Sequence, residues 1–332
     1  MQTKFWQLTT ENREQVFAEA GALIRAGELV AFPTETVYGL GANGLDGKAV
    51  RRIYEAKGRP SDNPLILHIA KLEDIQPLTG GLSPMALALA KKFWPGPMTL
   101  VVPKSDLIPD EVTAGLDTVA VRLPVNEDAR KFIETAGVPI AAPSANLSGK
   151  PSPTTAEDVA ADMEGRIAAI IDGGACDVGL ESTVIDTTGV VPMILRPGGI
   201  TPQMIEEALG KVEIDKGLSD PGQKPKAPGM KYKHYAPKAE MYLCRSEVTM
   251  LICVTKDLAA GRKVGVIHTQ PVVGCENRVY RSLEELANKL FFYLRDLDRS
   301  GVDVIYGLTV PEEGIGLAIM NRMKKSCGGS IL

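Results

Sequence analysis

The chain has 332 residues, of which 44% are hydrophobic and 23% are charged, and its net charge is -4 at pH 7. This composition is typical of a soluble globular protein with two domains or one large one. The acidic balance excludes a global basic field, so any contact with RNA would be local and weak. No apolar run approaches the roughly 20 residues of a membrane span, and the first 15 residues lack the apolar stretch of a signal peptide. We therefore expect a cytoplasmic protein with no membrane contact.

Cysteine and histidine are few and scattered. The five cysteines form no CxxC pair, which argues against a zinc site and is typical of reduced thiols in a cytosol. With three histidines in the whole chain, a mechanism built on several histidines is disfavoured. The sequence thus predicts no metal site made by the protein itself.

Helical and strand-like segments alternate through the first two thirds of the chain. Apolar periodicity predicts helices at 16–24, 49–54, 84–93, 127–136, 156–163 and 202–209. Short apolar runs predict strands at 29–32, 65–69, 100–102, 119–121, 140–142, 168–171, 183–185 and 193–195. Because some strands follow each other closely and others are separated by helices, we expect a twisted mixed sheet with helices.

The composition changes near Gly210. Residues 215–240 are rich in Pro, Gly and Lys and lack apolar periodicity, which is typical of a linker. A smaller α/β pattern follows, with strands at 241–244, 264–268 and 304–306 and helices at 248–260, 283–299 and 315–325. We therefore expect a catalytic domain at 1–210, a basic linker at 211–239 and a small α/β domain at 240–332.

A hydroxyl-rich stretch, PTETVYGLGANG, occupies residues 33–44, directly after the expected strand at 29–32. Open α/β sheets place ligands at the carboxyl ends of strands. If the strand continued through this stretch, Thr34, Thr36 and Tyr38 would face one side together. A polar turn is the alternative interpretation, and the stretch alone does not separate the two.

Four cations stand at expected turns and strand ends. Lys57 and Arg59 lie in KGRP, Arg122 ends the strand at 119–121, and Arg196 precedes Pro-Gly. Lys and Arg held on turns suit anionic oxygen, and a buried Arg needs an anionic partner. If these side chains converge, their ligand carries several negative charges. His68, in an apolar strand, is either a packed core residue or a ligand contact.

Small polar residues gather in APSANLSGKPSPTT (142–155) and GLESTVID (179–186). They are more numerous than helix capping requires, and a loop that presents hydroxyl, amide and backbone N–H groups suits phosphate or nucleobase recognition. No P-loop, GxGxxG or G-x-S-x-G motif accompanies them. The sequence therefore indicates an anion site outside the standard nucleotide motifs.

These motifs, taken in order, resemble one family. PTETVYGLG, KGRP..NPL, SAN.SG..SPT, ESTVID and LRPG are similar to the motifs of the YrdC family of threonylcarbamoyl-AMP synthases, over roughly residues 10–210. APGMKYKHYAP and GIGLAIMNRMKK resemble the long, two-domain members. The resemblance implies a YrdC-like twisted sheet followed by a smaller Rossmann-like α/β domain. It also implies a nucleotidyltransferase that makes L-threonylcarbamoyladenylate and pyrophosphate from L-threonine, bicarbonate and ATP.

The resemblance also implies roles for individual residues. L-threonine would contact Thr36, His68, Arg122, Ala142 and Ser182, with Arg122 on the carboxylate. ATP would contact Arg59, Asn63, Thr118, Ser144, Ser152, Arg196 and a linker tyrosine, Tyr232 or Tyr235. Lys57 and Arg59 would be the catalytic cations beside the phosphates or the bicarbonate. Mg²⁺ is expected with the ATP phosphates, and the basic linker is a candidate lid.

The expected product serves a separate protein complex, which transfers the threonylcarbamoyl group to the adenosine beside the anticodon of tRNA. Two alternatives remain open from the sequence. A carbamoyl-adenylate-forming enzyme would contain a similar module, although such chains are longer and carry zinc-finger segments that this one lacks. A non-catalytic RNA-binding module would use a basic surface, yet aromatic residues for base stacking make up only 5% of the chain.

Overall fold

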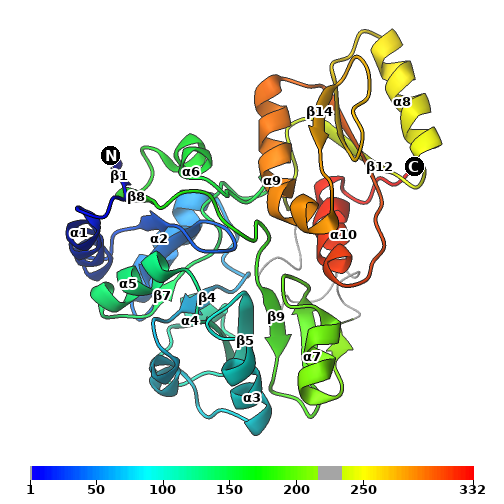
Figure 1. The fold of residues 1–332 in the computed structure, drawn as a ribbon. Helices are drawn as coiled ribbons and strands as arrows, with labels where there is room; N and C mark the ends of the chain where they lie inside the picture. Colours follow the sequence, from blue (N-terminus) through cyan, green and yellow to red (C-terminus); the bar gives the residue numbers. More distant parts are fainter. Residues whose placement is uncertain (1, 216–233) are drawn as a thin grey trace. The chain divides into compact units, whose positions relative to one another are not determined.

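The computed structural model describes residues 2–215 and 234–332, which divide into two units (Figure 1). The first unit contains the described residues up to Ser148 and from Pro153 to Asp215. The second contains Gly149–Ser152 and the residues from His234 onward. Most of the expected linker lies outside the described residues, including Tyr232.

A mixed sheet of eleven strands forms the frame of the described part of the first unit. Its order is β1 (Lys4–Gln7), β8 (Ala169–Asp172), β2 (Val30–Phe32), β3 (Gly39–Asn43), β7 (Ile140–Ala141), β4 (Ile66–His68), β6 (Thr118–Arg122), β5 (Met98–Pro103), β9 (Thr183–Asp186), β10 (Met193–Arg196) and β11 (Glu213–Ile214). The sheet contains both parallel pairs, such as β4–β6, and antiparallel pairs, such as β5–β6. The expected mixed α/β fold is confirmed. β11 lies within the segment expected to be linker and pairs with β10.

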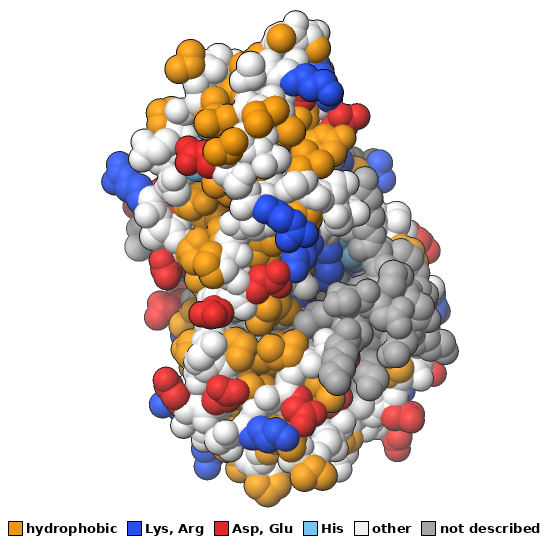
Figure 2. Space-filling model, turned by 90° about the vertical axis from the view of Figure 1, so that its right-hand side faces the viewer, with side chains coloured by type: hydrophobic (Ala, Val, Ile, Leu, Met, Phe, Trp, Pro, Cys, Tyr) orange, Lys and Arg blue, Asp and Glu red, His pale blue; other side chains and the backbone are white. Residues whose placement is uncertain are grey.

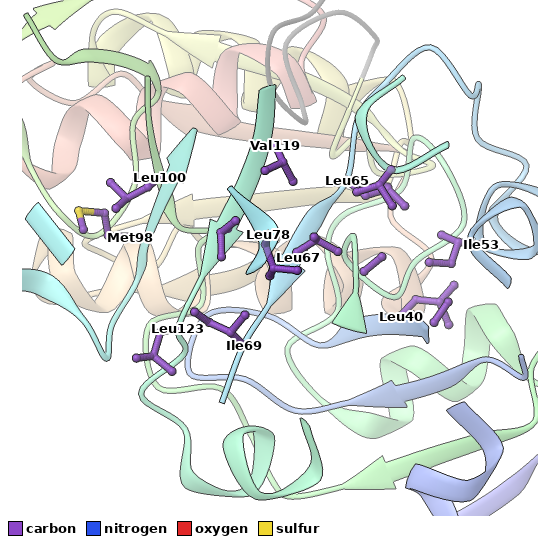
Figure 3. Packing of buried hydrophobic residues seen from close by; sticks show 14 of the residues in the cluster. Leu40, Ile53, Leu65, Leu67, Ile69, Leu78, Met98, Leu100, Val119 and Leu123 are labelled. Carbon is purple, nitrogen blue, oxygen red and sulfur yellow. The ribbon is translucent and has the colours of Figure 1, made fainter. Parts of the chain in front are cut away.

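Helices cover both faces of this sheet. On one face, α1 (Arg13–Arg25) and α5 (Glu127–Ala136) lie side by side over β2, β7 and β8 (Figure 1). The other face packs against α2 (Gly47–Lys57), η1 (Leu72–Leu78), α3 (Pro84–Phe93), α4 (Asp110–Thr113), α6 (Ala156–Met163) and α7 (Pro202–Leu209). Figure 3 shows part of this larger core, including Leu67, Leu100 and Val119 from three strands. Burying each such side chain contributes roughly 1.5–3 kcal/mol relative to leaving it exposed.

Local signals set the ends of the helix that carries Lys57. Asp46 precedes α2, and its side chain accepts a hydrogen bond from the backbone N–H of Lys48, which satisfies a group that the first turn leaves unpaired. Gly58 follows the helix with φ of 61°, a left-handed conformation that glycine adopts without steric cost. Lys57 is therefore held at a fixed helix end, just before the chain turns through Arg59.

The hydroxyl-rich stretch differs from the expected continuous strand. β2 ends at Phe32, the chain then bends through residues 33–38, and β3 begins at Gly39. The glycines lie inside β3 because a side chain there would collide with its neighbours. A Cβ on Gly41 would stand 2.8 Å from Ile140 Cγ2 and 3.1 Å from an aromatic carbon of Phe32. Thr34, Thr36 and Tyr38 therefore do not share one face of a strand.

The second unit is a parallel sheet of four strands. Its order is β12 (Glu240–Cys244), β15 (Val304–Leu308), β13 (Val264–His268) and β14 (Glu276–Val279). α8 (Glu247–Ala259) packs on one face through Met250 and Val254. α9 (Leu283–Ser300) and α10 (Ile315–Ser326) approach Gly265 and Gly307 of the sheet. The smaller α/β domain expected from the sequence is confirmed as a parallel sheet with helices.

Candidate active site

A row of neighbouring residues crosses five strands on the face that α1 and α5 partly cover. The strand register places Ile140 beside His68, His68 beside Arg122, Arg122 beside Thr99 and Thr99 beside Val184. Residues paired across a sheet point to the same side. The row therefore brings a histidine, an arginine and a threonine together in the middle of a sheet whose opposite face is apolar core.

Arg122 is almost completely buried, with 3% of its surface exposed. Its Nη1 donates a hydrogen bond of 2.8 Å to Thr36 Oγ1, and its Nη2 lies 2.6 Å from Glu35 Oε1. Both side chains of the ion pair are 4% exposed. Breaking a buried pair by removing one partner leaves an uncompensated charge, which strongly destabilises a fold. Arg122 and Glu35 thus depend on each other.

The two threonines of the stretch have different tasks. Thr34 Oγ1 donates to the backbone carbonyl of Val37 and accepts from the N–H groups of Thr36 and Val37, so it closes the turn. Because its proton goes to Val37, Thr34 is the acceptor in its 2.9 Å contact with Thr36. Thr36 is the one that accepts from Arg122. Tyr38 points elsewhere, with its hydroxyl donating to the carbonyl of Gly174.

His68 lies in this row as a neutral imidazole. Burial, together with the neighbouring Arg122 guanidinium, lowers the pKa of His68 to about 3. Nδ1 lies 3.2 Å from the carbonyl oxygen of Ile66, and the ring makes an edge contact with Phe32. His68 therefore packs like a core residue on one side while standing next to Arg122 on the other. It supplies no positive charge at neutral pH.

Ser182 and Arg196 meet on the far side of Thr99. Ser182 Oγ lies 2.7 Å from Thr99 Oγ1. Arg196 donates from Nε and Nη2 to the carbonyl of Ser182 at 3.1 and 3.0 Å, and from Nη2 to its hydroxyl at 3.2 Å. The structure thus places Arg196, an expected ATP contact, against Ser182, an expected threonine contact.

A second polar group lies at the amino ends of β4 and β6. Thr118 alternates with Ala120 and Arg122, so it points to the same face as Arg122. Thr118 and Arg122 are four positions apart along the strand, which is about 13 Å. Asn63 is fully buried at the start of β4, and neither atom of its side-chain amide has a hydrogen-bond partner among the described residues. A buried amide without partners is costly, which suits a position that a ligand completes.

Lys57 and Arg59 stand beside this second group. Lys57 is 2% exposed, and its Nζ donates to the carbonyls of Ser144 and Asn146, both at 2.5 Å. Arg59 Nη2 donates to the carbonyls of Asn63 and Pro64, both at 3.2 Å. The lysine therefore ties the end of α2 to the SAN loop, in which Ser144 Oγ contacts Asn146 Oδ1 at 2.5 Å. Ala142, which precedes this loop, is buried and donates its N–H to Ile66.

Two expected ATP contacts belong to the second unit. Ser152 is buried in the short segment Gly149–Ser152, whose Pro151 carbonyl accepts two hydrogen bonds from Arg295 of α9. Tyr235 is buried with φ of 64°, and its ring packs 5.0 Å from that of Phe291. The first unit by itself brings together the other expected contacts that are described.

Glu35 and Thr99 belong to no predicted site in the sequence. Glu35 forms the ion pair with Arg122, and Thr99 contacts Ser182. For Glu35 a signal was present, because a carboxylate between two threonines directly after a buried strand is out of place in a plain turn. Thr99 lies in an apolar strand, and only its register with Arg122 reveals it.

Charges of both signs are mixed on the molecular surface. On the face drawn in Figure 2, Lys and Arg side chains are interspersed with Asp and Glu side chains. Among the described residues, no group of three or more His, Cys, Asp or Glu side chains could hold a metal ion. None of the described helices is both long and apolar enough to cross a bilayer. The face drawn in Figure 2 therefore shows no large basic patch in the part of the chain that the structure describes.

The fold and the site define an α/β protein with buried cations and hydroxyl groups on one face of a mixed sheet. The chain belongs to the Sua5/YciO/YrdC family. The model of that family, described as "Telomere recombination", matches residues 22–198. A second model, described as "Threonylcarbamoyl-AMP synthase, C-terminal domain", matches residues 200–328.

Relatives are similar over nearly the whole chain. A protein of Bacillus subtilis named threonylcarbamoyl-AMP synthase is 48% identical over 100% of both chains. One of Pyrococcus abyssi with the same name is 52% identical over 94% of each. The crystal structure of P. abyssi Sua5 complexed with L-threonine is 50% identical and covers 100% of this chain and 99% of its own, with a TM-score of 0.95.

Proposed function

We propose that this chain is an L-threonylcarbamoyladenylate synthase, which forms threonylcarbamoyl-AMP and pyrophosphate from L-threonine, bicarbonate and ATP. One observation of the structure carries the proposal. Arg122 and Thr118 lie at opposite ends of β6, about 13 Å apart on the same face by strand geometry, with Thr36 beside Arg122 and the buried amide of Asn63 before the neighbouring β4. That separation suits an amino acid at one end and a nucleotide at the other. The names of the full-length relatives support the same assignment.

The chemistry requires positioning more than it requires a nucleophilic side chain. The threonine amine attacks the carbon of bicarbonate, and the resulting carbamate forms with loss of water. A carbamate oxygen then attacks the α-phosphorus of ATP and displaces pyrophosphate. Both steps bring negatively charged groups together, so cations that offset this charge and hold the reactants in line supply the catalysis.

The resemblance to the family supplies the roles of individual residues in this proposal. Arg122 and Thr36 hold the threonine carboxylate, with His68, Ala142 and Ser182 around it. Lys57 and Arg59 face the phosphates, and Asn63, Thr118, Ser144, Ser152, Arg196 and Tyr235 contact the rest of the nucleotide. Mg²⁺ enters with the phosphates as part of the ATP substrate. Tyr232 remains the alternative to Tyr235.

The product is consumed elsewhere in this proposal. A separate cytoplasmic complex transfers the threonylcarbamoyl group to the adenosine next to the anticodon of tRNA. The acidic net charge of the chain supports a division of labour in which this protein makes the adenylate and tRNA binds mainly to the transferring complex.

One assay tests the function. The pure protein is incubated with ATP, Mg²⁺, bicarbonate and L-threonine, and pyrophosphate is measured. Release that needs both threonine and bicarbonate is the expected result. Release that needs carbamoyl phosphate instead would identify a carbamoyl-adenylate-forming enzyme. No release, together with tight and salt-sensitive RNA binding, would identify a non-catalytic RNA-binding module.

A further inference from the structure

Glu35 is the acidic partner of the arginine that the proposed function places on the threonine carboxylate. It is 3% exposed, and its Oε1 lies 2.6 Å from Arg122 Nη2. Neither Oε1 nor Oε2 has a hydrogen-bond partner among the described residues, so the contact with Arg122 is an ion pair only. A buried carboxylate oxygen without a donor is costly and is stabilised when a donor or cation arrives.

The pair changes which ligands Arg122 favours. A buried guanidinium without an acidic partner would bind any carboxylate, because the negative charge of the ligand would neutralise the positive charge of the arginine. Glu35 offsets that charge from 2.6 Å, and His68 in the same row is neutral and adds no charge. A simple anion then brings an uncompensated negative charge into a buried site, which is unfavourable. A ligand that carries its own positive charge next to its carboxylate avoids this cost.

We infer that Glu35 makes this end of the site selective for an amino-acid zwitterion over a carboxylic acid without an amine. Arg122 and Thr36 take the carboxylate, and the Glu35 carboxylate offsets the α-ammonium. The inference rests on the proposed function for the identity of the amino acid, L-threonine. It assigns Glu35 a role in specificity, because it sets the charge of the site without taking part in bond formation.

The selectivity for a zwitterion is tested by comparing the affinities of two ligands. Calorimetric titration of the full chain without ATP compares L-threonine with 3-hydroxybutyrate, which keeps the carboxylate and hydroxyl but lacks the amine. We expect the wild type to prefer L-threonine by at least 100-fold. Glu35→Gln, which keeps the shape and removes the charge, should lower this ratio by at least tenfold by weakening threonine and admitting the anion.

Two further variants control the experiment. Glu111→Gln also removes one carboxylate from an ion pair with an arginine, Arg51, but on the surface side of α4, and it should leave the ratio unchanged. Glu35→Asp keeps the charge and should retain most of the preference. Circular dichroism melting confirms that each variant is folded before it is titrated.

Several outcomes would overturn the inference. A folded Glu35→Gln variant with the wild-type ratio would do so. If Glu35→Gln does not fold, the wild type alone tests the inference. A wild-type Kd for 3-hydroxybutyrate within tenfold of that for L-threonine would then contradict it. The pyrophosphate assay keeps the two proposals apart. Normal threonine-dependent turnover with an unchanged ratio rejects only the role of Glu35, whereas selective zwitterion binding without turnover rejects only the synthase.

Discussion

The two ends of the site hold their cations in different ways. Lys57 is bound by the backbone carbonyls of Ser144 and Asn146, whereas Arg122 is bound by the side chains of Thr36 and Glu35. Carbonyl oxygens have no net charge, so these two contacts orient the ammonium group by hydrogen bonding. The carboxylate of Glu35 does cancel the charge of Arg122. The proposed function assigns the triphosphate to the end with Lys57 and the threonine zwitterion to the end with Arg122.

The largest effect is expected at Lys57. Lys57→Met keeps the buried stem but removes the charge, so the rate of pyrophosphate release should fall by about 10²–10³-fold, as for other donors that stabilise a developing anion. Lys48→Met is the matched control, because Lys48 is exposed on the same helix. A Lys57→Met protein that is folded and turns over at near the normal rate would remove Lys57 from the phosphate end.

The next largest effect is expected at the ion pair between Arg122 and Glu35. Arg122→Met should raise the threonine KM by about 100-fold, because the carboxylate loses a charged, hydrogen-bonding partner. It should also lower the free energy of unfolding by about 3–5 kcal/mol, since Glu35 is left buried and unpaired.

A double variant sharpens this prediction. Glu35→Gln combined with Arg122→Met removes both charges, so urea unfolding should show most of the lost stability restored while the threonine KM stays high. Simple addition of the two single effects on stability would mean that the ion pair is not coupled.

A smaller contrast is expected between the neighbouring threonines. Thr36→Val removes the acceptor for Arg122 and should raise the threonine KM by about tenfold, the effect of one lost hydrogen bond to a charged group. Thr34→Val removes the three bonds that close the turn and should lower the stability by about 1–3 kcal/mol. Steady-state kinetics and urea unfolding of both variants test the contrast. Equal effects of the two variants on the threonine KM would contradict a binding role for Thr36 and a purely structural role for Thr34.

Periodicity alone predicted much of the fold. The helices at 84–93, 127–136, 156–163 and 202–209 have the predicted bounds in the structure, because each begins after a capping residue or proline and has apolar residues at helical spacing. β3 was missed, since GLGAN has the composition of a turn. It forms a strand because Phe32 and Ile140 pack against its glycines, and that contact is not visible in the local sequence.

The site was less accessible to reasoning from the sequence. Each motif alone identified cations and hydroxyl groups as candidate site residues. Their roles were indicated only by the order of the motifs, which resembles that of one family. The partnership of Glu35 with Arg122 joins residues 87 positions apart, one in the bend after β2 and the other at the end of β6. Ser152 could be read as part of the SAN loop, yet its segment belongs to the second unit. Such relations depend on tertiary packing, which no local pattern encodes.

The most gradual effect is expected from pH, because it is spread over several pH units. Burial and Arg122 lower the pKa of His68 to about 3 in the folded protein, whereas an unfolded histidine has a pKa of about 6.5. Below pH 6.5 the unfolded chain gains a proton that the folded protein does not, so stability is lost as the pH falls toward 3. The loss from this one group amounts to at most about 1.4 kcal/mol per pH unit.

His68→Gln should remove that dependence. Urea unfolding at pH 7, 6, 5 and 4 should give a slope of the unfolding free energy that is shallower in the variant by about one proton. Equal slopes would mean that His68 is protonated in the folded protein, and a second cation would then stand beside Arg122. The zwitterion site requires the opposite result, because the balance between Arg122 and Glu35 holds only while the imidazole between β6 and β7 stays neutral.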